Sequence, residues 1–305
     1  MKKVLKLCVG LFFVLLLSGC KNSVSDSGKF TIISTSFPGY DFARAIVKDV
    51  PDVSVKMLIS PGAEMHHYEP SPQDIIDIKN SDVFIYVGGD SDSWISDILN
   101  DIDTRKTKII KLMDLVDLSL EGDYDNNVTD EYDEHVWTSP VNAIEIIKKI
   151  SLEIIRLDID NQEIYQKNTD FYVEKISYID NEIRDVVNSS KRKELVFGDR
   201  FPLIYFTKEY GLNYYAAFPG CSEETEASAK TLAFLINKVK EDKIPVVFHL
   251  ELSKGSIASS ISEETGAKVL EFSSIHNISQ SEFDKGITYV DLMKKNIDVL
   301  KVALN

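Results

Sequence analysis

The stretch NQEIYQKNTDFYVEKISYIDNEIRDVV, residues 161–187, decides the fold of this chain. Its apolar side chains recur at three- and four-residue spacing, which predicts one amphipathic helix with a single buried stripe (Tyr172, Ile176, Ile179, Ile183 and Val186). Asp160 is its predicted N-cap, with Glu163 three residues further on. Such a helix is roughly 40 Å long, the width of a domain. We therefore expect a stiff connector between two other parts of the chain.

Strand-like and helix-like runs alternate on both sides of this helix. Before it we predict strands over 30–35, 53–59, 82–87 and 107–112 and helices over 39–50, 72–79 and 93–99. After it we predict strands over 194–197, 213–218, 245–249 and 268–272 and helices over 202–210, 227–241, 256–265 and 287–304. This alternation is typical of βαβ units. The predicted fold is α/β, with two βα lobes of mostly parallel sheets (30–158 and 191–305) joined by one long rigid α-helix (159–190).

The acidic segment over residues 118–134 interrupts this alternation. It is polar and has no period, which predicts an exposed loop. Its carboxylates either collect cations loosely or form only a solvated charged surface. After it, Ser139 is the predicted cap of another helix, with Pro140 at the first helical position.

Composition and charge narrow the class of protein. The 305 residues are 44% hydrophobic and 27% charged, as in ordinary globular proteins, and the length favours two domains. The formal net charge of −15 argues against nucleic acid as a partner, because binding to phosphates needs a basic face. It suits a carrier of cations or a soluble exported protein, and it does not distinguish between them.

The N-terminus has the features of an exported lipoprotein. A basic start is followed by an apolar run over residues 7–17. The run ends in LSGC (17–20), which resembles a bacterial lipobox and implies removal of a signal peptide (1–19) and acylation of Cys20. Residues 20–29 then form a lipidated tether to the extracytoplasmic face of the cell membrane. The alternative is a short buried helix that ends in cysteine. Cys221 is left as a lone thiol, either buried or reactive toward metals.

Histidines and carboxylates follow several of the predicted strands. All five histidines lie at predicted strand edges or in loops, and two carboxylates, Asp199 and Glu251, also follow strands. Their places are as follows: His66 and His67 come after 53–59, Asp199 after 194–197, His249 and Glu251 at the end of 245–249, His276 after 268–272, and His135 before Ser139. Ligands of open parallel sheets bind beyond the carboxyl ends of the strands, and neutral histidine is the commonest side-chain metal ligand. A single histidine equally suits a surface or core role, but their joint placement predicts a metal site between the lobes.

Motifs for catalysis are absent from the sequence. It contains no H-E-x-x-H, no G-x-S-x-G, no G-x-x-x-x-G-K-[ST] and no paired C-x-x-C. No glycine pattern for a dinucleotide opens a helix. We therefore expect a protein that captures an ion and is not an enzyme.

Two motifs resemble those of the metal-binding (zinc/manganese) solute-binding lipoproteins of ABC importers, the cluster A-I family. PGAEMHHYEPSPQD (61–74) resembles P-G-x-x-P-H-x-Y-E-P-x-P-x-D, and DEHVWTSPVNA (133–143) resembles D-P-H-x-W-x-D-P-x-N-A. The similarity extends over about residues 30–305. It implies two βα lobes joined by one long helix, with His66 and His135 as the first two metal ligands.

The sequence departs from this family at the third ligand. In the family, the third ligand is a His or Glu about ten residues before a Y-G-L motif. Here that motif is Tyr210-Gly211-Leu212, and the residue at that distance before it is Arg200, which cannot bind a cation. We predict the adjacent Asp199 as third ligand and Glu251 as runner-up. Asp199 has alternative roles as a partner of Arg200 or as a helix cap. The fourth position, about ten residues after Glu264-Thr265-Gly266, is His276.

These ligands favour Zn²⁺ as the captured ion. Three imidazoles and one carboxylate suit tetrahedral zinc, whereas Mn²⁺, the alternative, favours more carboxylate oxygen. The resemblance implies delivery of the ion to an ABC permease and its ATPase by a monomer with a lipid anchor in the membrane. The same scaffold would also suit a surface adhesin or a metal-dependent hydrolase.

Overall fold

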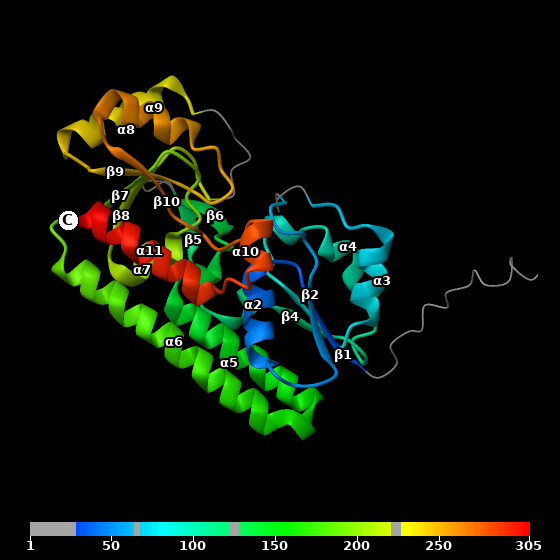
Figure 1. Ribbon diagram of the computed structural model, residues 1–305. Helices are drawn as coiled ribbons and strands as arrows, with labels where there is room; N and C mark the ends of the chain where they lie inside the picture. Colours follow the sequence, from blue (N-terminus) through cyan, green and yellow to red (C-terminus); the bar gives the residue numbers. More distant parts are fainter. Residues whose placement is uncertain (1–28, 64–67, 123–127, 221–226) are drawn as a thin grey trace, which may run out of the picture.

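The computed structural model describes residues 29–63, 68–122, 128–220 and 227–305. Of the predicted site residues, His66, Cys20 and Cys221 lie outside these ranges. Two four-stranded sheets, parallel throughout, form two lobes (Figure 1). The first has the strand order β2-β1-β3-β4 (β1 Phe30–Ser34, β2 Val53–Met57, β3 Val83–Tyr86, β4 Lys108–Lys111). The second has the order β10-β9-β7-β8 (β7 Glu194–Phe197, β8 Asn213–Ala216, β9 Val246–His249, β10 Lys268–Glu271).

Helices cover these sheets and join the lobes. Those of the first half of the chain are α2 Phe37–Ile46, α3 Pro72–Asn80, α4 Ile95–Leu99, α5 Pro140–Leu157 and α6 Gln162–Ser189. Those of the second half are α7 Ile204–Tyr210, α8 Ala229–Glu241, α9 Ser256–Thr265, α10 Gln280–Asp284 and α11 Tyr289–Leu304. The short helix α10 was not predicted.

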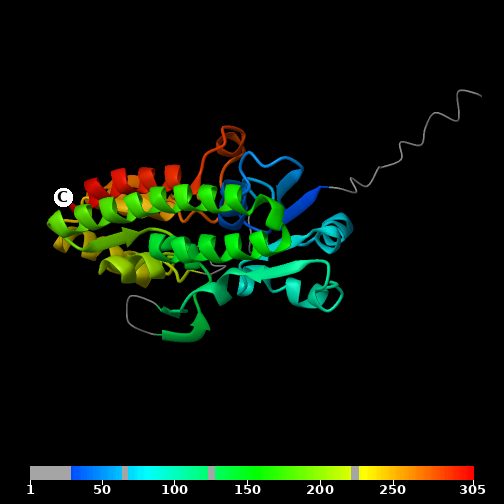
Figure 2. The same cartoon turned by 90° about the horizontal axis from the view of Figure 1, so that it is seen from below.

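The long helix α6 runs alongside α5 and extends beneath both lobes (Figures 1 and 2). Its predicted apolar stripe is buried (Tyr172, Ile176, Ile179, Ile183 and Val186). The predicted architecture of two parallel-sheet lobes and a long helix is therefore confirmed. The predicted N-cap is wrong: Asp160 lies in a 3-10 turn (Ile159–Asn161), and the cap residue, Asn161, makes no side-chain cap bond. At α5 the prediction holds, because the Ser139 hydroxyl accepts the Asn142 N–H.

The acidic segment is not simply an exposed loop. Strands β5 (Leu120–Gly122) and β6 (Val128–Tyr132) pair in antiparallel fashion within it. Glu121, Asp133 and Glu134 are buried, so the predicted solvated surface is wrong for these three carboxylates. The Tyr205 hydroxyl donates to the Asp133 carbonyl (2.8 Å) and fastens the end of the segment to α7. Such contacts come from residues distant in sequence, which a local pattern cannot show.

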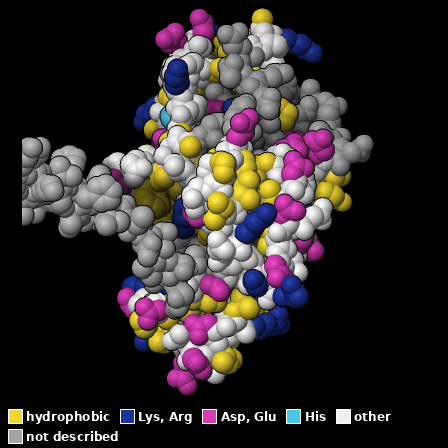
Figure 3. All heavy atoms as spheres, turned by 90° about the vertical axis from the view of Figure 1, so that its right-hand side faces the viewer, with side chains coloured by type: hydrophobic (Ala, Val, Ile, Leu, Met, Phe, Trp, Pro, Cys, Tyr) yellow, Lys and Arg dark blue, Asp and Glu magenta, His cyan; other side chains and the backbone are white. Residues whose placement is uncertain are grey.

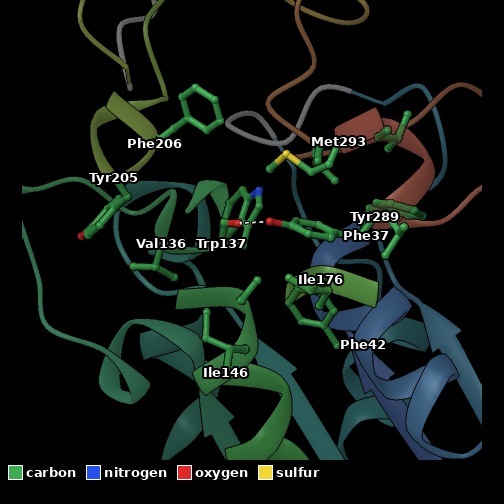
Figure 4. Packing of buried hydrophobic residues seen from close by; sticks show 14 of the residues in the cluster. Phe37, Phe42, Val136, Trp137, Ile146, Ile176, Tyr205, Phe206, Tyr289 and Met293 are labelled. Carbon is green, nitrogen blue, oxygen red and sulfur yellow. Dashed lines mark hydrogen bonds between the residues drawn. The ribbon is translucent and has the colours of Figure 1, made fainter. Parts of the chain in front are cut away.

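One apolar core extends through both lobes (Figure 4). At its centre the Tyr289 hydroxyl donates to the Trp137 carbonyl (2.9 Å), and the Trp137 indole N–H donates to the Ser274 carbonyl (2.8 Å). The Tyr289 ring also packs edge-on against Phe42 of α2, with 5.3 Å between centroids. The start of α11 is therefore anchored on the first lobe. This shared core holds the loops of the two lobes close together.

The surface shows how the charge is distributed. On the face of the first lobe in Figure 3, the described Lys and Arg side chains lie among Asp and Glu side chains. The net charge of −15 is therefore not offset by a continuous basic area on the described part of that face. None of the described helices combines the length and the apolar character needed to cross a bilayer.

Candidate metal centre

Two predicted ligands, His135 and His276, lie side by side. His135 precedes the 3-10 turn Val136–Thr138 that leads into α5, and His276 lies in the loop after β10. Their ring centroids are 5.0 Å apart and the rings are nearly perpendicular (82°). Only 1% of His135 and 9% of His276 is exposed. Residues on either side of the long helix in sequence thus meet at one buried point.

Glu134 and these histidines form a group of three side chains that could hold a metal ion. One ligand atom from each of Glu134, His135 and His276 lies within 4.8 Å of the other two, and all three residues are buried. Glu134 was not predicted as a ligand. The available signal was its place in the second motif, where the resembling family has proline and this chain has a carboxylate next to His135.

Asp133 orients the His135 ring. Its Oδ1 atom lies 3.2 Å from His135 Nδ1 and accepts the His135 backbone N–H at 2.8 Å. A proton held on Nδ1 leaves Nε2 with a lone pair for a metal. Burial lowers the pKa of His135, but the carboxylates of Asp133, Glu134 and Glu121 outweigh burial and raise it.

The Glu134 carboxylate occupies a niche made by the segment after β3. Its Oε2 atom accepts the Ser91 N–H (3.1 Å), and the Ser91 hydroxyl bonds to Oε1. Gly89 makes room for it: a Cβ atom there would lie 2.4 Å from Glu134 Oε2, and the φ angle of +74° also favours glycine. Burial raises the pKa of Glu134, and the charge of His135 and the Ser91 bonds oppose that rise without cancelling it.

The predicted carboxylates Asp199 and Glu251 bond to backbone. Asp199 Oδ1 accepts the Arg200 N–H (2.9 Å), and Oδ2 accepts the Leu250 N–H (3.2 Å), so this side chain links the ends of β7 and β9. Glu251 accepts the backbone N–H groups of Ser274 (2.7 Å) and His276 (3.1 Å). It thereby shapes the loop that carries His276. Neither residue belongs to the three-residue group, and their roles as third ligand and runner-up stay predictions.

A pocket of about 80 Å³ lies against both histidine rings. Arg200, Glu251 and Ala63 also line it. Pockets for organic ligands are several times larger, about 300–1,000 Å³, so this pocket suits an ion.

The loop that carries His276 is bonded to the turn that leads to His66. The Asn277 side-chain amide donates to the carbonyls of Ser60 (3.0 Å) and Ala63 (2.9 Å). The Gly62 N–H donates to the Ile278 carbonyl (2.7 Å). Two loops from different lobes therefore form one hydrogen-bonded unit at the edge of the pocket.

Comparison with known proteins identifies the family. Residues 32–303 match the family described as zinc-uptake complex component A, periplasmic (ZnuA). The chain belongs to this family. Within the ZnuA family it is 32% identical to the high-affinity zinc uptake system protein ZnuA of Bacillus subtilis, over 97% of both chains. It is 31% identical to the zinc-binding lipoprotein AdcA of Streptococcus pneumoniae and spans 61% of that longer protein.

Solved structures of ZnuA-like proteins have the same fold. The Zn(II)-bound ZnuA-like domain of Streptococcus pneumoniae AdcA aligns with a TM-score of 0.77 at 30% identity, over 91% of this chain and 99% of that one. The metal-dependent lipoprotein YcdH of Bacillus subtilis aligns with a TM-score of 0.79 at 31% identity, over 91% and 100%. The resemblance inferred from the two motifs is therefore confirmed.

Proposed function

We propose that this chain captures Zn²⁺ outside the cytoplasm and delivers it to an ABC permease and its ATPase. The meeting of His135 and His276 in a pocket of ionic size carries the proposal. The zinc named in the descriptions of its ZnuA and AdcA relatives supports it. Cargo ions bind here by coordination, so no chemical step is required of the protein.

The proposed ligands come from distant parts of the chain. His66, His135 and His276 supply imidazole nitrogens, and Asp199 is the carboxylate predicted from the sequence. This donor set favours zinc over manganese. Burial of both described rings removes water from the ion, which strengthens each metal–ligand interaction.

The proposed location follows from the N-terminal sequence. Removal of residues 1–19 and acylation of Cys20 would hold the protein at the outer face of the membrane, close to its permease, with 20–29 as tether. One acyl chain binds membranes only marginally, so stable anchoring requires several. A lipoprotein relative, AdcA, supports this part of the proposal. Within this arrangement we propose lobes over 30–158 and 191–305, a connecting helix over 159–190, and a monomer.

Metal content tests this function. Purified protein dialysed after zinc loading is expected to retain about one zinc per chain by elemental analysis, and manganese should not displace it. His135→Ala and His276→Ala should each weaken zinc binding by at least 100-fold in chelator competition. His249→Ala is the matched control, because the His249 ring bonds to the Leu250 carbonyl (2.9 Å) outside the three-residue group. Protein that takes up no zinc, or binds it equally well without His135, contradicts the proposal.

A further inference from the structure

We infer that Glu134 is the carboxylate ligand of the captured zinc ion, in place of a ligand at the position of Arg200. This inference rests on the proposed function. It joins Glu134 to His135 and His276 in one site.

The geometry favours Glu134 over the other acidic candidates. Among the described residues, Glu134 is the acidic residue that joins His135 and His276 in the group whose ligand atoms lie within 4.8 Å of one another. A tetrahedral zinc site places ligand atoms about 2.0–2.2 Å from the ion and therefore about 3.5 Å apart. A movement of about 1 Å by each side chain would close the group on an ion.

Burial of the Glu134 carboxylate also favours a bound cation beside it. Its side chain is fully buried, and its hydrogen bonds come from the neutral Ser91. None of the ion pairs among the described residues joins it to lysine or arginine. A buried carboxylate without a cation is unfavourable. A divalent ion held jointly with the two histidines removes that imbalance.

Local structure is arranged around this carboxylate. Gly89 leaves space that a Cβ atom would fill, and Ser91 holds both carboxylate oxygens from one side. Each oxygen retains a further lone pair for a metal. Bonds of this kind orient metal-binding carboxylates. The backbone after β3 therefore serves as the support for a ligand from the segment before α5.

The rival carboxylate is engaged elsewhere. Both oxygens of Asp199 accept backbone N–H groups that link β7 and β9. Among the described residues, Asp199 does not belong to the group whose ligand atoms lie within 4.8 Å of one another. Arg200, at the position that the family resemblance assigns to the third ligand, lines the pocket and offers no lone pair. The carboxylate of the site has therefore moved from the loop after β7 to the residue before His135.

Glu134→Gln tests the inference, with Glu209→Gln as the matched control, because Glu209 pairs with Arg184 and does not line the pocket. Both changes remove one negative charge and keep the size of the side chain. Zinc affinity is measured by chelator competition on the full chain, beside the unaltered protein. Glu134→Gln should weaken zinc binding at least 100-fold, and Glu209→Gln less than threefold. The metal-free Glu134→Gln variant should melt at the same or a higher temperature, because it loses an uncompensated buried charge.

The outcomes separate this inference from the proposed function. If the unaltered protein binds zinc and Glu134→Gln binds it with the same Kd, the inference is overturned and the proposed function stands. An unaltered protein that binds no zinc overturns the function itself. If Glu134→Gln does not fold, a zinc-soaked crystal of the unaltered protein, with anomalous scattering at the zinc edge, decides. An ion within about 2.2 Å of a Glu134 oxygen supports the inference, and one beyond hydrogen-bonding distance overturns it.

Discussion

The contact between the two ligand loops predicts that Asn277 controls zinc affinity without touching the ion. Asn277 is 3% exposed and follows His276 directly. Its amide donates to the carbonyls of Ser60 and Ala63, across the gap between the lobes. Asn277→Ala removes both bonds and keeps every proposed ligand. The loop with His276 and the turn before His66 would then be held mainly by the bond from Gly62 to Ile278.

The expected size of the effect follows from these two bonds. A neutral hydrogen bond contributes about 1 kcal/mol net, so the docked arrangement loses about 2 kcal/mol. This loss shifts the balance between docked and separated loops by about 30-fold, because 1.4 kcal/mol is a factor of about ten. In the proposed site, zinc takes ligands from both loops at once. Its Kd should therefore rise by up to about 30-fold, mainly through faster dissociation.

Chelator competition and stopped-flow release of zinc to a chelator measure the two quantities. Asn181→Ala is the matched control, because the Asn181 amide donates to the Ser177 carbonyl (2.9 Å) within α6. The control should bind zinc like the unaltered protein. A folded Asn277→Ala variant with a Kd within twofold of the unaltered value would refute the reasoning. It would mean that docking of the loops does not limit capture of the ion.

Three further changes test other parts of the structure. Gly89→Ala should weaken zinc binding and lower the free energy of unfolding by about 2 kcal/mol or more, because the new Cβ atom would displace Glu134. Gly211→Ala is the control: its Cβ atom would meet nothing within 4 Å, so it should cost only about 1 kcal/mol. Equal losses for the two variants in calorimetry would contradict this. Burial raises the pKa of Asp92 to about 7. The folded state then binds more protons than the unfolded state between about pH 4 and pH 7, so stability falls as pH rises there. Asp92→Asn should remove up to about 4 kcal/mol of that fall in urea unfolding with EDTA, and an unchanged pH profile argues against it. Trp137→Phe should lower stability by about 2–4 kcal/mol through a cavity and a lost 2.8 Å bond, and a loss below about 1 kcal/mol would contradict the packing.

Local patterns predicted most of the secondary structure. The stripe from Tyr172 to Val186 repeats at the helical period, and the strands are short β-branched runs between helical patterns, so each can be recognised within its own segment. The bounds of the predicted elements differ from the observed ones by about four residues at most. The Asp160 cap failed because the chain forms a 3-10 turn before α6.

The candidate metal centre was only partly predictable. His135 and His276 were predicted as ligands from motifs and spacing, and the structure brings their rings together. Glu134 was missed because it lies in a segment that reads as solvated, and its burial depends on Ser91 and Gly89, more than forty residues earlier in the chain. Asp199 stays a predicted ligand, and its hydrogen bonds to the backbone beyond β7 and β9 could not be read from the sequence.

The sequence by itself determined the two alternating βα series, the long helix and the histidines, because these depend on short-range periodicity and on the chemistry of single side chains. Only the tertiary structure decided which carboxylate lies beside them and how the loops of the two lobes are bonded together. Those outcomes depend on which distant groups satisfy each buried charge and hydrogen bond, and that pairing is established when the shared core brings the lobes into contact.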